Sequence, residues 1–135
     1  MIRGSALYPA AAERIRAFTQ IFPEIDAEFH LAIRNPASFL PVLYSRQRGK
    51  TFDEVMGGAD PRDLSWLKLV EEVRALNPDA NLTVWCDEDT PLIWPEVLRA
   101  VSGHAIGTVL TDTDDLLAEI MSPEGLERSR RARWK

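Results

Sequence analysis

Apolar residues recur at helical spacing in six segments of the chain, and most of these segments begin or end at a capping residue, a proline or a glycine. We expect helices over residues 9–22, 36–46, 51–56, 65–76, 90–101 and 112–121. Pro41 lies inside the second range and predicts a kink or an early end there. Pro123 is expected to interrupt the last helix, and the polar end beyond Arg128 is expected to fray.

Two other segments have the pattern of β-strands. In residues 26–34, Phe29, Leu31 and Ile33 would share one face, and residues 82–86 form the apolar run of a buried parallel strand. Because helices separate the two strands along the chain, the pattern predicts an α/β fold with a parallel sheet. Two strands cannot cover so many helices, so we expect an incomplete three-layer sheet with few strands.

The composition fits one globular domain. The chain has 135 residues, of which 45% are hydrophobic and 27% are charged, and this is enough to bury a single core. We expect one partial α/β domain over residues 1–127, followed by a basic tail over residues 128–135.

Charge and cysteine content limit the partners and the cellular compartment that we expect for this protein. The last eight residues carry five positive charges and no acid, which leaves the preceding 127 residues at −10. Such a body offers no broad attraction to nucleic acid, and no apolar run approaches the roughly 20 residues of a membrane span. The single cysteine, Cys86, excludes an internal disulfide and favours a reducing compartment. We therefore expect a cytoplasmic protein without a nucleic-acid or membrane partner.

The most informative motif joins the first strand to the helix that follows it. Arg34 stands at the end of the strand, and Asn35 and Pro36 are suited to the start of a helix. Open α/β sheets bind ligands at this end of their strands, and a guanidinium beside a helix N-terminus can bind an anion. The motif indicates a phosphate site at Arg34. The alternative is an arginine that pairs with a surface carboxylate.

This strand, Arg34-Asn35-Pro36 and the helix resemble the 3′-phosphate-binding element of P-loop sulfotransferases, which use 3′-phosphoadenosine-5′-phosphosulfate as sulfuryl donor. The second strand with Glu88-Asp89, and the next helix through Val101-Ser102-Gly103, are similar to later elements of that family. The resemblance extends over roughly residues 5–125. It implies a sheet of P-loop NTPase and sulfotransferase type, and 3′-phosphoadenosine-5′-phosphosulfate or adenosine 3′,5′-bisphosphate as the ligand.

The sequence also departs from that family. The glycine- and lysine-rich loop that binds the phosphosulfate is absent, and no catalytic base is recognisable. The family has a phosphate-binding serine eight positions after the arginine, where this chain has Val42. Ser38 and Ser45 are the serines of this helix, and both lie off the family's register. The candidate cofactor-binding residues are Arg34, Ser38 and Ser45. Without the loop, most of the charge stabilisation that sulfuryl transfer needs is missing.

These observations leave three interpretations. The first is a sulfotransferase-related protein that is not catalytically competent as this chain, has no catalytic residues of its own and requires no cofactor. The second is a non-catalytic α/β module that associates with itself, as a homo-oligomer, or with a partner through an exposed sheet edge. The third is a truncated reading frame.

Other motifs carry weaker signals. Residues 49–51 end like a phosphate-binding loop, but no strand precedes them, and Thr51 is better interpreted as a helix cap. Residues 87–89 are three acids that suit either a divalent cation or a solvated turn, and we favour the turn. Cys86, His30 and His104 do not have the spacing of metal ligands, and Cys86 is expected to be a core thiol.

Overall fold

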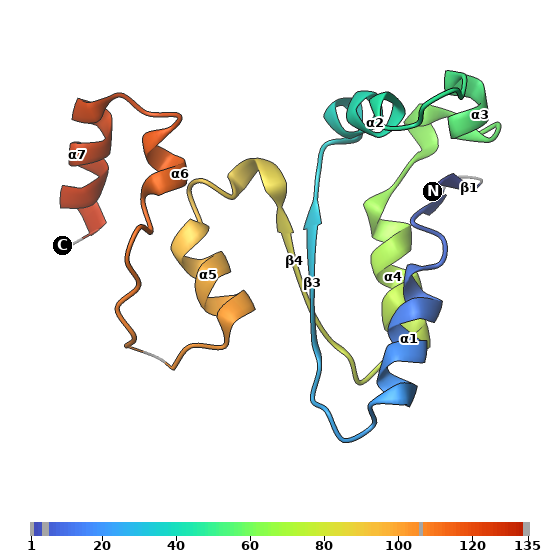
Figure 1. Ribbon diagram of the computed structural model, residues 1–135, viewed down its shortest axis with the longest axis horizontal. Helices are drawn as coiled ribbons and strands as arrows, with labels where there is room; N and C mark the ends of the chain where they lie inside the picture. The colour runs from blue at the N-terminus through green and yellow to red at the C-terminus, as the bar shows by residue number, and fades with distance from the viewer. Residues whose placement is uncertain (1, 4–5, 106, 134–135) are drawn as a thin grey trace. The chain divides into compact units, whose positions relative to one another are not determined.

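The computed structural model describes residues 2–3, 6–105 and 107–133 (Figure 1). Over these residues it is a mixed α/β structure, which confirms the expected class. Its helices are α1 (Ala11–Ile21), α2 (Pro36–Ser45), α3 (Phe52–Met56), α4 (Trp66–Leu76), α5 (Trp94–Ser102), α6 (Asp115–Ala118) and α7 (Pro123–Arg133). Its strands are β1 (Ile2–Arg3), β2 (Ala6–Leu7), β3 (Glu28–Ile33) and β4 (Asn81–Cys86). Short 3-10 turns, η1 and η2, cover Pro61–Asp63 and Asp87–Asp89.

The four strands form two separate two-stranded sheets. Strands β3 and β4 lie side by side and run in the same direction (Figure 1), as the intervening helices predict. Strands β1 and β2 pair in the antiparallel sense, with Ile2 opposite Leu7. The sequence analysis missed this second pair because strands of two residues are too short to show an alternating pattern. A three-layer sheet of P-loop type stays a prediction.

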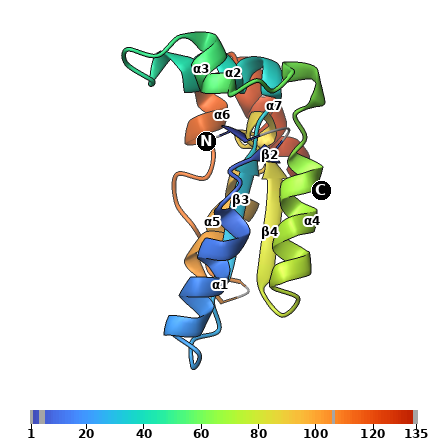
Figure 2. The same ribbon diagram turned by 90° about the vertical axis from the view of Figure 1, so that its right-hand side faces the viewer.

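Helices α1 and α4 pack against each other and cover one face of the β3–β4 sheet (Figure 2). Ala12, Leu69 and Val73 are the buried residues of this layer, and Leu31 and Leu82 contact it from the two strands. The helices can pack this way because their apolar residues recur at helical spacing, so each helix presents one apolar stripe.

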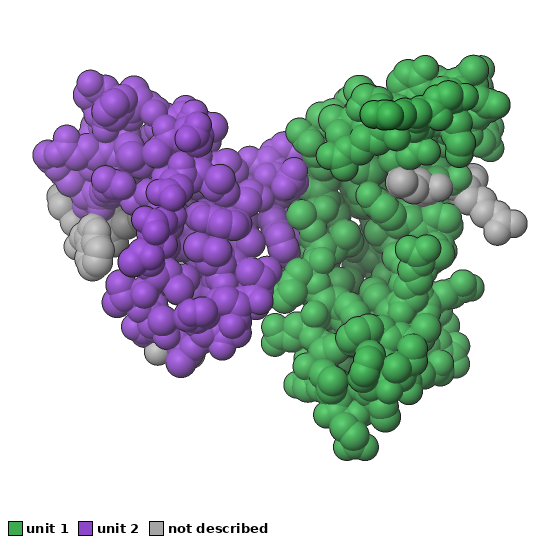
Figure 3. Space-filling model, in the orientation of Figure 1, with its two compact units in different colours: residues 1–84 green, residues 85–135 purple. Residues whose placement is uncertain are grey.

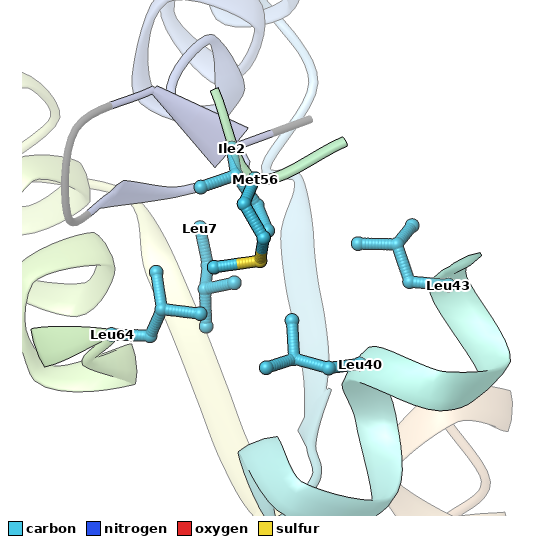
Figure 4. Packing of buried hydrophobic residues seen from close by; sticks show 6 residues of the cluster. All are labelled: Ile2, Leu7, Leu40, Leu43, Met56 and Leu64. Atoms are coloured by element: carbon cyan, nitrogen blue, oxygen red, sulfur yellow. The ribbon is translucent and has the colours of Figure 1, made fainter. Parts of the chain in front are cut away.

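A second buried cluster lies where β1, β2, α2 and α3 meet. Its side chains point toward one another (Figure 4), and Leu40 and Leu43 enter it from the same face of α2. The buried members are Ile2, Leu7, Leu40, Leu43, Met56 and Leu64. Helix α2 continues past Pro41, so the expected early end does not occur.

The chain forms two compact units, residues 1–84 and 85–135 (Figure 3). The first contains both buried clusters. In the second, the buried apolar side chains include Val97 of α5 and Leu117 of α6. The single domain expected over residues 1–127 stays a prediction.

Three predictions about the helices of the second unit are wrong. The helix expected to begin at Thr90 begins at Trp94, because Asp87–Asp89 form a 3-10 turn first. The helix expected over residues 112–121 is reduced to α6. Pro123 begins α7 instead of interrupting a helix, since a first-turn proline needs no N–H partner.

The basic end that was expected to fray is helical as far as Arg133. Two side-chain contacts hold this helix. The guanidinium of Arg130 pairs with Asp114 at 2.8 Å, and Arg131 pairs with Glu127 one turn earlier. Residues 134 and 135 lie outside the described residues.

Strand β4 is not the buried strand that its composition suggested. Only Leu82 and Trp85 are half-buried, and the other four residues, Cys86 among them, are exposed. The prediction of a core thiol at Cys86 is therefore wrong. The physical reason is that β4 has a neighbouring strand on one side only, and within the first unit the helices cover one face of the sheet.

The packing of α1 on α4 predicts a large loss of stability when the buried side chain of Leu69 is truncated. Leu69 is 2% exposed, whereas Leu67 on the same helix is 64% exposed. We expect Leu69→Ala to lower the free energy of unfolding by about 2–5 kcal/mol, because it leaves a cavity. The matched change Leu67→Ala is expected to stay within about 0.5 kcal/mol. Urea denaturation followed by circular dichroism measures both, and equal losses would contradict the packing described.

Thr51 and Glu54 cap the start of α3 reciprocally, and this capping box predicts that the stability of the fold depends on pH. The backbone N–H and then the hydroxyl of Thr51 donate to the Glu54 carboxylate, and these bonds lower the pKa of Glu54. A lowered pKa in the folded state means that the contribution to stability is present above the unfolded-state pKa and is lost as the pH falls through the folded-state value. We expect Thr51→Ala to raise the pKa of Glu54 part of the way back, since the backbone bond remains.

Nuclear magnetic resonance titration of the Glu54 carboxyl measures this shift. Thr51→Ser is the matched control, because it keeps the hydroxyl and should keep the lowered pKa of Glu54. An unchanged pKa in Thr51→Ala would show that the hydroxyl does not contribute to the cap.

Candidate functional site

Arg34 follows the last residue of β3 and is half-buried. Its backbone is held from a distant part of the chain, because the indole N–H of Trp66 donates a hydrogen bond to the Arg34 carbonyl oxygen. Trp66 is the first residue of α4. The bond therefore fixes the end of the strand against the start of the helix that packs on the sheet.

Asn35 starts α2 as the sequence predicts. Its side-chain oxygen accepts a hydrogen bond from the N–H of Ala37 at 2.9 Å, and Pro36 occupies the first turn. The N–H of Ala37 is therefore already bonded within the chain, and the N–H groups of Ser38 and Phe39 both donate to the Asn35 carbonyl oxygen. The strand–arginine–helix arrangement inferred from the sequence is present.

The two candidate serines lie at opposite ends of α2. The hydroxyl of Ser38 donates to the carbonyl oxygen of Asn35 at 3.0 Å, and the hydroxyl of Ser45 donates to that of Val42 at 2.9 Å. Seven residues of helix separate the serines, which is a rise of about 10 Å. One phosphate group therefore cannot contact both hydroxyls together with Arg34.

Arg34 lines a cavity of about 260 Å³ in the first unit. The lining comes from the end of β3, the start of α1, the first turn of α2 and the first turns of α4. The lining residues are Tyr8, Ala11, Leu31, Ala32, Arg34, Phe39, Trp66 and Leu69. Arg34 is the one charged side chain among them, and neither Ser38 nor Ser45 belongs to the lining.

Three aromatic rings form one wall of this cavity. Tyr8 stacks on Trp66 with ring centroids 6.0 Å apart and an angle of 25°, and Phe39 meets Trp66 edge-on at 5.3 Å. The Tyr8 and Phe39 rings are 6.1 Å apart. Tyr8 has a φ of +50°, a left-handed conformation that costs a side-chain-bearing residue energy and occurs often at functional sites.

The sequence analysis identified Arg34 but missed these three rings. Phe39 and Trp66 occupy apolar helix positions, where an aromatic residue is most often part of the core. Tyr8 lies in a short connection before α1 and has no pattern of its own. No signal in the sequence brings the three rings together, because their contact depends on the packing of α4 against the end of β3.

The cavity combines one guanidinium with aromatic surface. A guanidinium binds a phosphate or carboxylate through two parallel hydrogen bonds. Aromatic faces favour flat apolar rings. The arrangement suits a ligand that joins an anionic group to a planar ring, and it offers no second charged group that would assist bond cleavage.

The remaining sequence motifs have local structural roles. Thr51 caps α3, and Asp87–Asp89 form a 3-10 turn. His30 lies 3.7 Å from the carboxylate of Glu28, measured from Nε2 to the nearer oxygen. Within the described part of the chain, no three histidine, cysteine, aspartate or glutamate side chains gather as metal ligands do. In the same part, no helix has both the length and the apolar character that crossing a membrane requires.

Other cavities in the described part of the chain are larger than this one, and the two largest of them, of about 630 and 600 Å³, lie one in each unit. The first lies beyond the ends of α1 and α4, and its lining mixes Arg16 with three carboxylates. The second lies between α5 and the loop before α6, and its Arg130 is already paired with Asp114. Neither contains a residue that the sequence marked as a candidate, so the smaller cavity at Arg34 is the better site.

None of the protein-family models, curated proteins and solved structures compared with this chain matches it.

The anchor of the site predicts a measurable loss when the indole N–H is removed. Trp66→Phe keeps an aromatic ring against Tyr8 and Phe39 but leaves the Arg34 carbonyl without its indole donor. We expect the free energy of unfolding to fall by about 1–3 kcal/mol, the cost of an unsatisfied, partly buried acceptor. Urea denaturation measures the change. A Trp66→Phe protein as stable as the parent would show that the bond does not hold the strand end.

Proposed function

We propose that this chain binds a nucleotide through a phosphate group at Arg34 and is a sulfotransferase-related protein without catalytic activity of its own. The observation that carries the proposal is the position of Arg34. Its side chain lines an aromatic cavity at the end of β3, beside the first turn of α2.

The chemistry of the cavity supports a nucleotide over a simple anion. Arg34 can hold a phosphate monoester through two parallel hydrogen bonds. The aromatic wall of Tyr8, Phe39 and Trp66 supplies a surface for a planar ring. A ligand that carries both groups, such as adenosine 3′,5′-bisphosphate, uses both features, whereas inorganic phosphate uses only the guanidinium.

The same cavity supports binding without group transfer. Transfer of a sulfuryl or phosphoryl group needs several cations or N–H donors directed at the moving group. The lining of the cavity contains a single charged side chain, Arg34. We therefore propose that 3′-phosphoadenosine-5′-phosphosulfate, if bound, stays intact.

A second candidate function is that of a non-catalytic module that associates with itself. The observation that favours it is the open edge of β4, a strand without a single charged residue. The two functions use different residues and do not exclude each other.

The binding proposal predicts an Arg34-dependent affinity for adenosine 3′,5′-bisphosphate. We expect the nucleotide to bind in isothermal titration calorimetry and Arg34→Ala to weaken it roughly tenfold to a hundredfold, which corresponds to the loss of a charge-assisted hydrogen-bonding pair. Arg34→Lys should recover only part of the affinity, because an ammonium group cannot form the two parallel bonds.

Arg46→Ala is the matched control. Arg46 is exposed and follows the last residue of α2, about 15 Å of helix from its start, so its removal should leave the affinity unchanged. Adenosine, which lacks phosphate, should bind more weakly than the bisphosphate to the parent protein. The proposal is wrong if no heat is released, or if Arg34→Ala and Arg46→Ala behave alike.

A further inference from the structure

A further cavity, which we call the Arg14 cavity, adjoins the one at Arg34. It measures about 380 Å³ and lies beside the segment that joins β2 to α1. Tyr8 and Ala11 line both cavities, so the two meet along these residues. All the residues that line either cavity belong to the first unit. The Arg14 cavity is lined by Tyr8, Pro9, Ala10, Ala11, Arg14 and Ile15.

The cavity at Arg34 is smaller than most sites that bind small molecules. Its volume of about 260 Å³ is below the roughly 300–1,000 Å³ of such sites. The two adjoining cavities together fall within that range. A nucleotide whose phosphate is bound at Arg34 is therefore expected to extend past Tyr8 into the Arg14 cavity.

Arg14 gives its cavity a positive charge. It lies three residues after Ala11, so the two residues share one face of α1, about 4.5 Å apart along the helix axis. The side chain of Arg14 is exposed and forms no ion pair within the described part of the chain. No acidic residue belongs to the described lining. The Arg14 cavity is therefore suited to an anionic group.

The net charge of the chain explains why a second cation matters. The 127 residues before the basic end carry a net charge of −10, which repels an anionic ligand. A phosphate monoester carries a charge of about −1.5 to −2 at pH 7, and a single guanidinium does not neutralise it. A nucleotide with two phosphate groups therefore needs a cation near each of them.

We propose that the ligand of this site is a nucleotide with two separate phosphate groups, one bound by Arg34 and the other by Arg14. This inference rests on the nucleotide binding proposed above, and it adds Arg14 as the residue that selects a bisphosphate over a monophosphate. The nucleoside that joins the two phosphate groups would lie against Tyr8, which lines both cavities and is 40% exposed.

The same arrangement selects against a diphosphate. Arg34 and Arg14 lie in different cavities, with Tyr8 and Ala11 between them. A diphosphate extends from a single position of the nucleoside, so binding it at Arg34 leaves Arg14 without a phosphate group. A bisphosphate carries its two phosphate groups at different positions of the ribose and can reach both guanidinium groups.

Isothermal titration calorimetry on the full chain tests the proposal with three probes: adenosine 3′,5′-bisphosphate, adenosine 3′-monophosphate and adenosine 5′-diphosphate. We expect Arg14→Ala to weaken binding of the bisphosphate roughly threefold to tenfold, and to leave the affinity for the other two probes within about twofold. The loss is smaller than that expected for Arg34→Ala, because Arg14 is exposed and an exposed ion pair competes with water.

Arg16→Ala is the matched control. It removes the same charge from the same helix, but Arg16 lies about 200° around α1 from Arg14 and lines a different cavity. Its removal should leave the affinity for all three probes unchanged. The comparison therefore separates a direct contact at Arg14 from a general loss of positive charge.

The outcomes distinguish this inference from the function on which it rests. Suppose that the bisphosphate binds and that Arg34→Ala weakens it. Equal affinities of the Arg14→Ala and Arg16→Ala proteins would then overturn the role of Arg14 and leave the proposed function intact. An equal effect of Arg14→Ala on the bisphosphate and the diphosphate would do the same. If the bisphosphate does not bind, or binds without dependence on Arg34, both proposals are wrong.

Discussion

The position of the end of β3 depends on one long-range contact, the hydrogen bond from the Trp66 indole to the Arg34 carbonyl oxygen. The two residues are 32 positions apart in the sequence, and the bond joins the end of β3 to the start of α4. Because α4 also packs on α1 and on the sheet, the strand end cannot move independently of the helical layer. A partly buried carbonyl would otherwise lack its partner, which is the energetic reason for the contact.

This anchor explains why the candidate site forms where it does. It holds the backbone of Arg34 beside the Trp66 ring, and Tyr8 and Phe39 complete the aromatic wall. The result is one guanidinium in a mostly apolar cavity of about 260 Å³. Such a lining is chemically suited to an anionic ligand that carries a planar ring.

The sequence predicted those features that depend on neighbouring residues. The caps at Asn35 and Thr51 define the starts of α2 and α3, because a side chain and a backbone N–H two or three positions later suffice to form them. Features that depend on packing were missed. They include the aromatic wall and the exposure of Cys86. The cofactor-binding residues stay a prediction: Arg34 lines the cavity, whereas Ser38 and Ser45 do not.

The most direct test of this account is the exchange rate of the Trp66 indole proton, measured by nuclear magnetic resonance on the full chain. The signal can be assigned from its loss in Trp66→Phe. The account predicts exchange at least roughly tenfold slower than for the same proton in the urea-unfolded chain, because a hydrogen-bonded, partly buried donor exchanges only after local opening. Exchange at the rate of the unfolded chain would contradict it, since the strand end and α4 would then not be joined at Arg34.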